Sequence, residues 1–285
     1  MSVEDYLASK GYTIDTNLFP LCQFRFPLIG VILYLMVTFY FQPPANNPGK
    51  VAAESPSTST ASQTSKSKKA KSKDTKPSIT GMKLFMFVHN SLLCMFSALC
   101  FYNTSPIISA ILFHDGFNGA LCGKQLEQLY SNGIDSVWGL WVFLFYLSKF
   151  YEFIDTFIVI ARGRRPILLQ TFHHCGAVLG MWGVLVTQCT GGYLFVVENS
   201  FIHTIMYFYY AMSSINIRVP GKFIITQAQM IQFVIGNSIA LVQLFGYADC
   251  MRFEDKFVIS FHVIYTTCLL LLFRAFYKKT YKKSK

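Results

Sequence analysis

The stretch VWGLWVFLFYLSKFYEFIDTFIVIARGRRP, residues 137–166, joins a long apolar run to a basic end. The run exceeds the roughly 20 residues that a helix needs to cross a bilayer. Its internal charges are Lys149, Glu152 and Asp155, and arginines follow directly after Ala161. An apolar helix that stops at clustered arginines is typical of a membrane span ending in the cytosol. The stretch therefore predicts an all-α, polytopic membrane protein.

The composition of the whole chain agrees with this prediction. Of 285 residues, 53% are hydrophobic, 16% aromatic and only 14% charged, yet the net charge is +11. Ordinary soluble domains carry about 25% charged residues. So apolar a chain cannot be disordered over most of its length. Its aromatic runs also lack the interleaved basic residues of a nucleic-acid binder, so no nucleic-acid partner is expected.

Hydropathy predicts seven transmembrane helices, of which the first is the shortest. The helices are expected over 26–42, 82–102, 135–161, 166–187, 193–212, 222–246 and 256–276. The further apolar segment 105–113 is short and contains Pro106, so it is predicted to be interfacial or re-entrant.

The basic residues orient these spans. If the C-terminus is cytosolic, the cytosolic connections are basic and the luminal ones are acidic or neutral, as the positive-inside rule requires. Residues 1–25 are then a luminal N-terminus, 43–81 a disordered basic cytosolic linker, 82–276 a six-helix membrane domain and 277–285 a cytosolic tail. Lys282 and Lys283 resemble a dilysine signal for retrieval to the endoplasmic reticulum, and an ordinary basic stop-transfer tail is the alternative.

Polar residues inside five of the spans fall at one depth, about 9–18 Å from the cytosolic ends at 1.5 Å per helical residue. Such residues are costly in a bilayer and usually functional. Their common depth predicts a buried polar chamber between helices that opens to the cytosol. Its members are Asn90, Lys149, Glu152, Asp155, His173, His174, His203, Gln229 and Gln232.

Simpler interpretations exist for single members of this set. Lys149 and Glu152 are three residues apart, on the helix face that also carries Asp155, and could form a structural ion pair. His173 and His174 are adjacent, so only one need face the chamber while the other packs against a neighbour. A lone buried histidine is usually a packing group, but His203 at the same depth favours function.

Five motifs resemble those of the fatty-acid elongase family, the membrane 3-ketoacyl-CoA synthases. They are NSLLCMFS (90–97), KFYEFIDT (149–156), QTFHH (170–174), HTIMYFYY (203–210) and TQAQMIQ (226–232). The family's histidine box begins with His, whereas this chain has Gln170. Gln at this position resembles the family members that elongate polyunsaturated chains.

The resemblance implies condensation of a long-chain, polyunsaturated acyl-CoA with malonyl-CoA to a 3-ketoacyl-CoA two carbons longer, with loss of CO2 and CoA. It implies six helices around an acyl tunnel with a seventh outside, in the endoplasmic-reticulum membrane beside a ketoacyl reductase, a dehydratase and an enoyl reductase. Membrane lipid is a further partner, and a homodimer stays open. No bound cofactor or metal is expected.

Three groups of site residues follow from the chamber and the motifs. The catalytic group is His173, His174, His203, Glu152, Asp155 and Lys149. The substrate-binding group is Asn90, Gln170, Tyr207, Tyr210, Gln229 and Gln232. A basic rim at the chamber mouth is expected to hold the CoA phosphates, although ordinary positive-inside charge explains any one member: Arg162, Arg164, Arg165, Arg218 and Lys222.

With no cysteine placed as a nucleophile, the chemistry must use histidine. His173 is predicted to accept the acyl group, with His174 and His203 assisting at the malonyl thioester. Direct condensation with histidine as base is the alternative. A metal-dependent desaturase or hydroxylase is the rival function, opposed by a total of six histidines. A membrane carrier is opposed by the one-sided polar slab. Cys122 and Cys250, in two predicted luminal loops, could form a disulfide.

Overall fold

The computed structural model describes residues 19–44, 81–122 and 137–281, and every element in these ranges is helical, as expected. Of the predicted linker at 43–81, residues 45–80 lie outside the described residues, as does the dilysine pair. The helices are α2 (Phe19–Cys22), α3 (Arg25–Phe41), α4 (Gly81–Cys122), α6 (Val137–Tyr151), α7 (Phe153–Ala161), α8 (Leu168–Thr187), α9 (Thr190–Ser214), α10 (Lys222–Gly246) and α11 (Phe253–Tyr281), with the 3-10 turn η4 (Ala248–Cys250).

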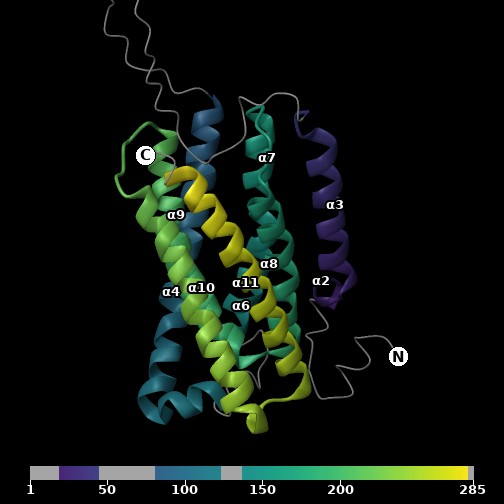
Figure 1. Ribbon diagram of the computed structural model, residues 1–285, viewed down its shortest axis with the longest axis vertical. Helices are drawn as coiled ribbons and strands as arrows, with labels where there is room; N and C mark the ends of the chain where they lie inside the picture. Colours follow the sequence, from purple (N-terminus) through teal and green to yellow (C-terminus); the bar gives the residue numbers. More distant parts are fainter. Residues whose placement is uncertain (1–18, 45–80, 123–136, 282–285) are drawn as a thin grey trace, which may run out of the picture.

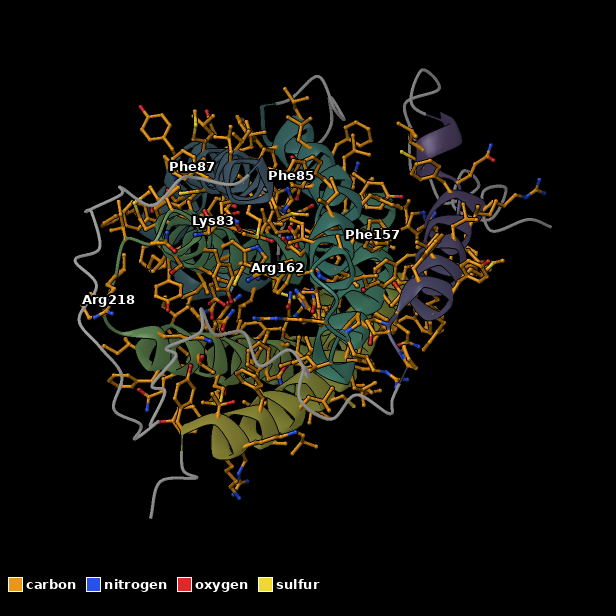
Figure 2. The ribbon with its side chains drawn as sticks, turned by 90° about the horizontal axis from the view of Figure 1, so that it is seen from above. Lys83, Phe85, Phe87, Phe157, Arg162 and Arg218 are labelled. Carbon is orange, nitrogen blue, oxygen red and sulfur yellow. A yellow bond between two sulfur atoms is a disulfide. The ribbon has the colours of Figure 1, made fainter. Side chains whose placement is uncertain are left out.

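The long helices run along one axis of the molecule, with α11 crossing the front at an angle (Figure 1). Neighbouring helices contact each other in the order α4, α9, α10, α11, α8 and α6, and α6 contacts α4 again. These contacts close a ring. Helix α3 packs against α7 and α8, and it stands to one side of the ring when the molecule is viewed from above (Figure 2). The arrangement agrees with the expected six-helix bundle and outer helix.

Three helical segments are long and apolar enough to cross a membrane: Gly81–Phe113, Lys222–Gly246 and Phe253–Tyr281. Their outer faces carry large exposed apolar side chains, including Phe85, Ile231 and Leu271. Exposed apolar surface on such helices is suited to contact with lipid. The other predicted spans also coincide with helices, but seven crossings stay a prediction.

The segment 105–113 differs from the prediction, because helix α4 continues through Pro106 instead of ending before a separate re-entrant piece. Two side chains just before the proline donate to carbonyls of the preceding turn. The Thr104 hydroxyl donates to the Cys100 carbonyl at 2.7 Å, and the Asn103 amide donates to the Leu99 carbonyl at 2.7 Å. Pro106 itself removes only one backbone hydrogen bond, the one to the carbonyl four residues before it. The non-helical residue comes later, at Gly116, where φ is 64°.

The predicted helix 135–161 is divided at Glu152 into α6 and α7. The Ser148 hydroxyl donates to the Phe145 carbonyl at 2.7 Å, so it competes for a helix acceptor just before the break. The division lies beside the charged side chains of the motif at 149–156. It thus alters the helix where the predicted chemistry is concentrated.

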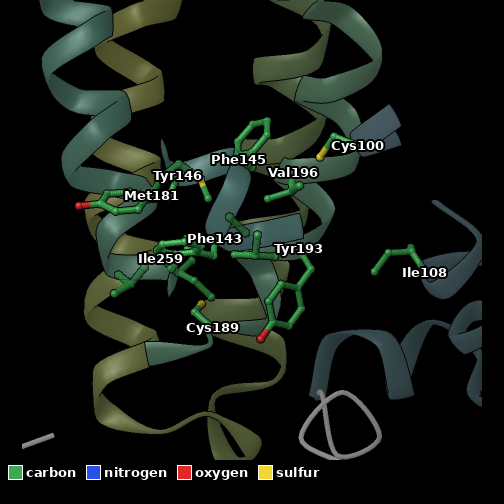
Figure 3. Packing of buried hydrophobic residues seen from close by; sticks show 14 of the residues in the cluster. Cys100, Ile108, Phe143, Phe145, Tyr146, Met181, Cys189, Tyr193, Val196 and Ile259 are labelled. Carbon is green, nitrogen blue, oxygen red and sulfur yellow. The ribbon is translucent and has the colours of Figure 1, made fainter. Parts of the chain in front are cut away.

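An apolar core holds the helices together away from the polar residues (Figure 3). Phe143 and Tyr146 of α6 pack here with Met181 of α8, Tyr193 of α9 and Ile259 of α11. A disulfide between Cys122, at the end of α4, and Cys250 in η4 confirms the pairing expected from the sequence.

Candidate active site

A cavity of about 530 Å³ lies inside the ring, among α4, α7, α8, α9, α10 and α11. It is where the sequence places the polar chamber. Thirteen of the predicted site residues line it: Asn90, Glu152, Asp155, Arg162, Arg164, Gln170, His173, His174, His203, Tyr207, Tyr210, Gln229 and Gln232. They come from five helices, from Glu152 and from the segment after α7 that carries Arg162 and Arg164, and the outermost two, Asn90 and Gln232, are 142 positions apart.

One end of the cavity is basic. Arg162 and Arg164 line it, together with Lys83 from the first turns of α4, which sequence reasoning did not include. Figure 2 looks down on this end and shows Lys83 and Arg162 between the helices, with Arg218 at the outer edge. Arg218 does not line the cavity.

Two more residues of the predicted rim lie elsewhere. The Arg165 guanidinium donates to the Gln42 side chain at the end of α3, at 3.1 Å. Lys222 is the first residue of α10 and is not among the residues that line the cavity. The cationic groups that the structure brings to the cavity are therefore Lys83, Arg162 and Arg164, which could meet a phosphate.

A buried ion pair lies beside the cavity. Lys149 donates to Glu152 Oε1 at 2.7 Å and to the Asn199 side-chain oxygen at 3.3 Å, and both members of the pair are 2% exposed. Its ammonium group also lies 3.9 Å from the centre of the Phe145 ring. Lys149 does not itself line the cavity, so it acts on this space through Glu152 and Asn199.

The three predicted histidines converge but play different geometric parts. The ring centroids of His173 and His203 are 6.4 Å apart, and His203 Nδ1 lies 3.7 Å from Glu152 Oε1. The His174 ring meets Tyr34 and Phe153 edge-on at 6.0 and 6.1 Å. His173 and His203 therefore lie close together beside Glu152, and the His174 ring lies between two aromatic rings.

Tyr265 determines which nitrogen of His173 carries the proton. The Tyr265 hydroxyl donates to the His173 backbone carbonyl at 2.8 Å, and it also lies 3.1 Å from His173 Nδ1. A hydroxyl has one proton, and a carbonyl can only accept. The oxygen of Tyr265 must therefore accept a hydrogen bond from Nδ1–H. This tautomer leaves a lone pair on Nε2 of His173.

The Asp155 carboxylate links side chains of two other helices. Its carboxylate lies 2.8 Å from His89 Nε2 and accepts a hydrogen bond of 2.9 Å from the Tyr207 hydroxyl. Asp155 thus joins α4, α7 and α9 and orients none of the three predicted histidines. Glu152 is the carboxylate nearest to His203.

The side-chain amides of the substrate-binding group differ in whether they already have a hydrogen-bond partner. Asn90 donates to the Met86 carbonyl of its own helix at 2.6 Å, and Gln229 contacts Met206 Sδ at 3.2 Å. The buried Nε2 of Gln232 makes no hydrogen bond within the described parts of the chain. Gln232 therefore lines the cavity with an unused hydrogen-bond donor.

The predicted site left out four residues that the structure brings here: Lys83, His89, Asn199 and Tyr265. Lys83, His89 and Asn199 are polar residues inside predicted spans, so the signal that selected the chamber was present for them. Nothing in the sequence distinguished Tyr265 from many other tyrosines, because its partner is 92 positions away.

Glu198 and His262, which the sequence also places in spans, line a second and smaller cavity towards the other ends of α9 and α11. That cavity also meets α8 and α10, at Val184 and Gly236.

Residues 19–285 match the model of the ELO: GNS1/SUR4 family. "Fatty acid elongase A" of Dictyostelium discoideum is 31% identical over 215 residues, which cover 70% of this chain and 72% of that protein. "Very long chain fatty acid elongase 6" of Drosophila melanogaster is 29% identical over 201 residues, covering 68% and 61%.

"Putative fatty acid elongase 3" of Caenorhabditis elegans is 30% identical over 205 residues, covering 70% of this chain and 61% of that protein. The matches thus span about three fifths of the length of the fly and worm relatives. The family match itself covers nearly all of the chain, including every residue that lines the cavity. The chain belongs to the ELO: GNS1/SUR4 family of fatty acid elongases.

Proposed function

We propose that this protein is the condensing enzyme of fatty-acid elongation, a 3-oxoacyl-CoA synthase that joins a long-chain acyl-CoA to malonyl-CoA. The observation that carries the proposal is the enclosed pair of His173 and His203, with a free imidazole lone pair, beside the Lys149–Glu152 ion pair. The elongase names of the relatives support it and do not favour a desaturase or hydroxylase.

The first step is acyl transfer to the protein. Nε2 of His173 attacks the thioester carbonyl, the C–S bond breaks, and CoA leaves as a thiolate that takes up a proton. Imidazole is a competent nucleophile when its lone pair is free and oriented. Tyr265 supplies this orientation, because its oxygen accepts the Nδ1 hydrogen of His173. Because His173 keeps its Nδ1 hydrogen, the product is a positively charged acyl-imidazolium, and the proton that the thiolate takes up comes from water.

The second step uses malonyl-CoA. Loss of CO2 leaves an enolate, whose carbon attacks the acyl carbonyl and displaces Nε2 of His173. The sum consumes one proton and releases CO2 and one free CoA for each new bond. His203, or the amide of Gln232, is placed to stabilise the enolate oxygen. Condensation without the acyl-imidazole, with His173 as base, is the alternative route.

The basic end of the cavity is assigned to CoA. Lys83, Arg162 and Arg164 line it, and their side chains can bind phosphate oxygens by charge-assisted hydrogen bonds. The doubly substituted variant Arg162→Gln/Arg164→Gln is expected to raise KM for malonyl-CoA. An unchanged KM would exclude the two arginines from CoA binding. Arg218, at the outer edge, provides a matched control as Arg218→Gln.

The acyl chain is proposed to be polyunsaturated. Gln170 lines the cavity at the start of α8, where it can donate and accept hydrogen bonds but cannot take an acyl group. The remaining parts of the proposal are the endoplasmic-reticulum membrane, with the N-terminus in the lumen, and the ketoacyl reductase, dehydratase and enoyl reductase as partners.

Incubating purified protein with labelled malonyl-CoA and a panel of saturated and polyunsaturated acyl-CoAs tests the function. The expected product is a labelled 3-ketoacyl-CoA two carbons longer, formed fastest from polyunsaturated chains. Desaturated or hydroxylated acyl-CoA without label would overturn the assignment. A Gln170→His variant should shift the preference towards saturated chains, and unchanged selectivity would remove Gln170 from substrate choice.

A further inference from the structure

We propose that Glu152, His173 and His203 bind a divalent transition-metal ion of the zinc class, and that the bound ion inhibits the protein. Each of the three side chains offers one ligand atom, and these atoms lie within 4.8 Å of one another. Metal binding is independent of the proposed function. Inhibition rests on it, because the ion would occupy the histidine that accepts the acyl group.

The donor set suits zinc. Two imidazole nitrogens and one carboxylate oxygen are the protein ligands of many zinc sites, which leave a fourth position open. Zinc bonds of about 2.1 Å place tetrahedral ligands roughly 3.4 Å apart. His203 Nδ1 and Glu152 Oε1 are already 3.7 Å apart. These two atoms are therefore already close to the spacing of zinc ligands, and all three ligand atoms lie within 4.8 Å of one another.

The ligand atoms have lone pairs to give. His173 has its proton on Nδ1, so Nε2 is unprotonated. Glu152 and His203 are 2% and 4% exposed. Within the described part of the chain, Glu152 Oε2 and His203 Nδ1 make no hydrogen bond. Buried polar atoms without a partner are costly, and a metal ion would satisfy both atoms at once.

Selectivity follows from the same ligands. Magnesium and calcium prefer oxygen ligands and would find one carboxylate here. Two imidazoles instead favour zinc, cobalt, nickel and copper. The site is thus not expected to bind the magnesium present in most assays of nucleotide-containing substrates.

One nearby charge opposes the ion. Lys149 donates to Glu152 Oε1 at 2.7 Å, so its ammonium group would repel a bound cation. Asp155, the other carboxylate on the cavity wall, is held by His89 and Tyr207. Because of this repulsion, removing the charge of Lys149 should strengthen metal binding. Removing a ligand should weaken it.

Titration of the purified full-length chain with Co²⁺ and Zn²⁺ tests the site. The protein carries Cys268→Ser, because Cys268 is an exposed free thiol that could bind metal. We expect one equivalent of Co²⁺ with d–d absorption and no thiolate charge-transfer band. His203→Asn should weaken binding more than about tenfold, since loss of an outer-sphere partner alone costs about 10–100-fold. Lys149→Met should tighten it.

His262→Asn is the matched control, because His262 is a histidine of the second cavity. It should bind cobalt as the parent does. Equal affinity in the parent, His203→Asn and Lys149→Met proteins would overturn the site, as would no binding in the parent or a thiolate band.

Single-turnover CoA release from acyl-CoA tests the inhibition. Zn²⁺ should block the release reversibly, and a chelator should restore it. CoA release at the normal rate by the zinc-loaded protein would overturn the inhibition while leaving binding intact. If the zinc-free protein makes no ketoacyl product, the proposed function fails, and the cobalt titration still decides the site.

Discussion

Single residues fix the orientation of side chains at this cavity through contacts between different helices. Tyr265 of α11 holds the Nδ1 hydrogen of His173 on α8, and His89 of α4 holds Asp155 on α7. Neither Tyr265 nor His89 belongs to the motifs of the sequence. Both act by presenting another side chain in one orientation, so they are positioning residues.

Replacing Tyr265 with Phe should slow acyl transfer with little change in KM for acyl-CoA. The ring still fills its space, but Nδ1 loses its acceptor, so His173 spends less time as the Nδ1–H tautomer with a free Nε2. A decrease in the rate of CoA release of about 10–100-fold is expected, equivalent to ~1.4–2.8 kcal/mol. Single-turnover CoA release measures it.

Tyr277→Phe is the control for this substitution, since Tyr277 lies on the same helix and contacts the exposed Gln227. Its rate should match that of the parent protein. If Tyr265→Phe released CoA as fast as the parent protein, the rate of acyl transfer would not depend on the tautomer that Tyr265 selects.

Replacing His89 with Phe should destabilise the protein. Asp155 would lose its 2.8 Å partner, and a carboxylate with an unmet hydrogen bond in a mostly buried site costs about 1–3 kcal/mol. The variant His89→Gln, whose side-chain amide can still donate to the carboxylate, should recover part of the loss. Thermal unfolding in detergent compares the three proteins, and identical Tm values for all of them would show that the His89–Asp155 contact contributes nothing.

Helices place these residues, and the apolar runs of the sequence predicted the helices well. The structure has a helix at each expected span. A single apolar segment in a bilayer can pair all of its backbone N–H and C=O groups only as a helix. Its details depend on local side chains that hydropathy ignores. Helix α4 continues past Pro106, and the Ser148 hydroxyl bonds the Phe145 carbonyl just before α6 ends.

The sequence predicted most of the residues that line the site, but it did not predict which of them contact each other. Motif spacing placed Lys149 next to Glu152, because residues three apart on a helix are neighbours. Contacts between helices have no such rule. His89 and Asp155 are 66 positions apart, and His173 and Tyr265 are 92 apart. The order in which the helices close the ring decides these pairs, and the sequence carries no simple signal of that order.

Helices α8 and α11 approach closely at Gly176, which leads to a prediction at the scale of elements. A Cβ at Gly176 would overlap the Tyr265 ring. Val at this position should therefore push α11 away, lower stability by about 1–3 kcal/mol and slow acyl transfer as Tyr265→Phe does. Thermal unfolding and CoA release measure both effects.

Gly180 provides the control one helical turn further along α8. A Cβ there would lie 3.6 Å from Phe261, an ordinary contact distance, so Gly180→Ala should be tolerated. If Gly176→Val were tolerated equally well, the close approach of the two helices would not hold Tyr265 in place.

The whole molecule is a closed ring of helices with a polar cavity near one end and an apolar core towards the other. The disulfide between Cys122 and Cys250 joins chain segments 128 positions apart, at the end of α4 and in the turn after α10. A crosslink over so long a loop restricts the unfolded chain strongly. The disulfide thereby fixes α4 to the turn after α10, away from the cavity.

Removing this crosslink should reduce stability but leave the chemistry unchanged. The Cys122→Ser/Cys250→Ser protein is expected to lose about 2–5 kcal/mol of stability. Below its lowered Tm, its rate of CoA release should equal that of the parent. A lower rate at temperatures where the variant is fully folded would mean that the disulfide also shapes the cavity.

In the proposed reaction, Nε2 of His173 accepts the acyl group inside this cavity. This step is tested by incubating the protein with acyl-CoA in the absence of malonyl-CoA, quenching it, and mapping the peptides by mass spectrometry. We expect an acyl adduct on His173, absent from His173→Asn and discharged by malonyl-CoA to the 3-ketoacyl product. An unmodified His173 in protein that completes single-turnover condensation at its normal rate would contradict it.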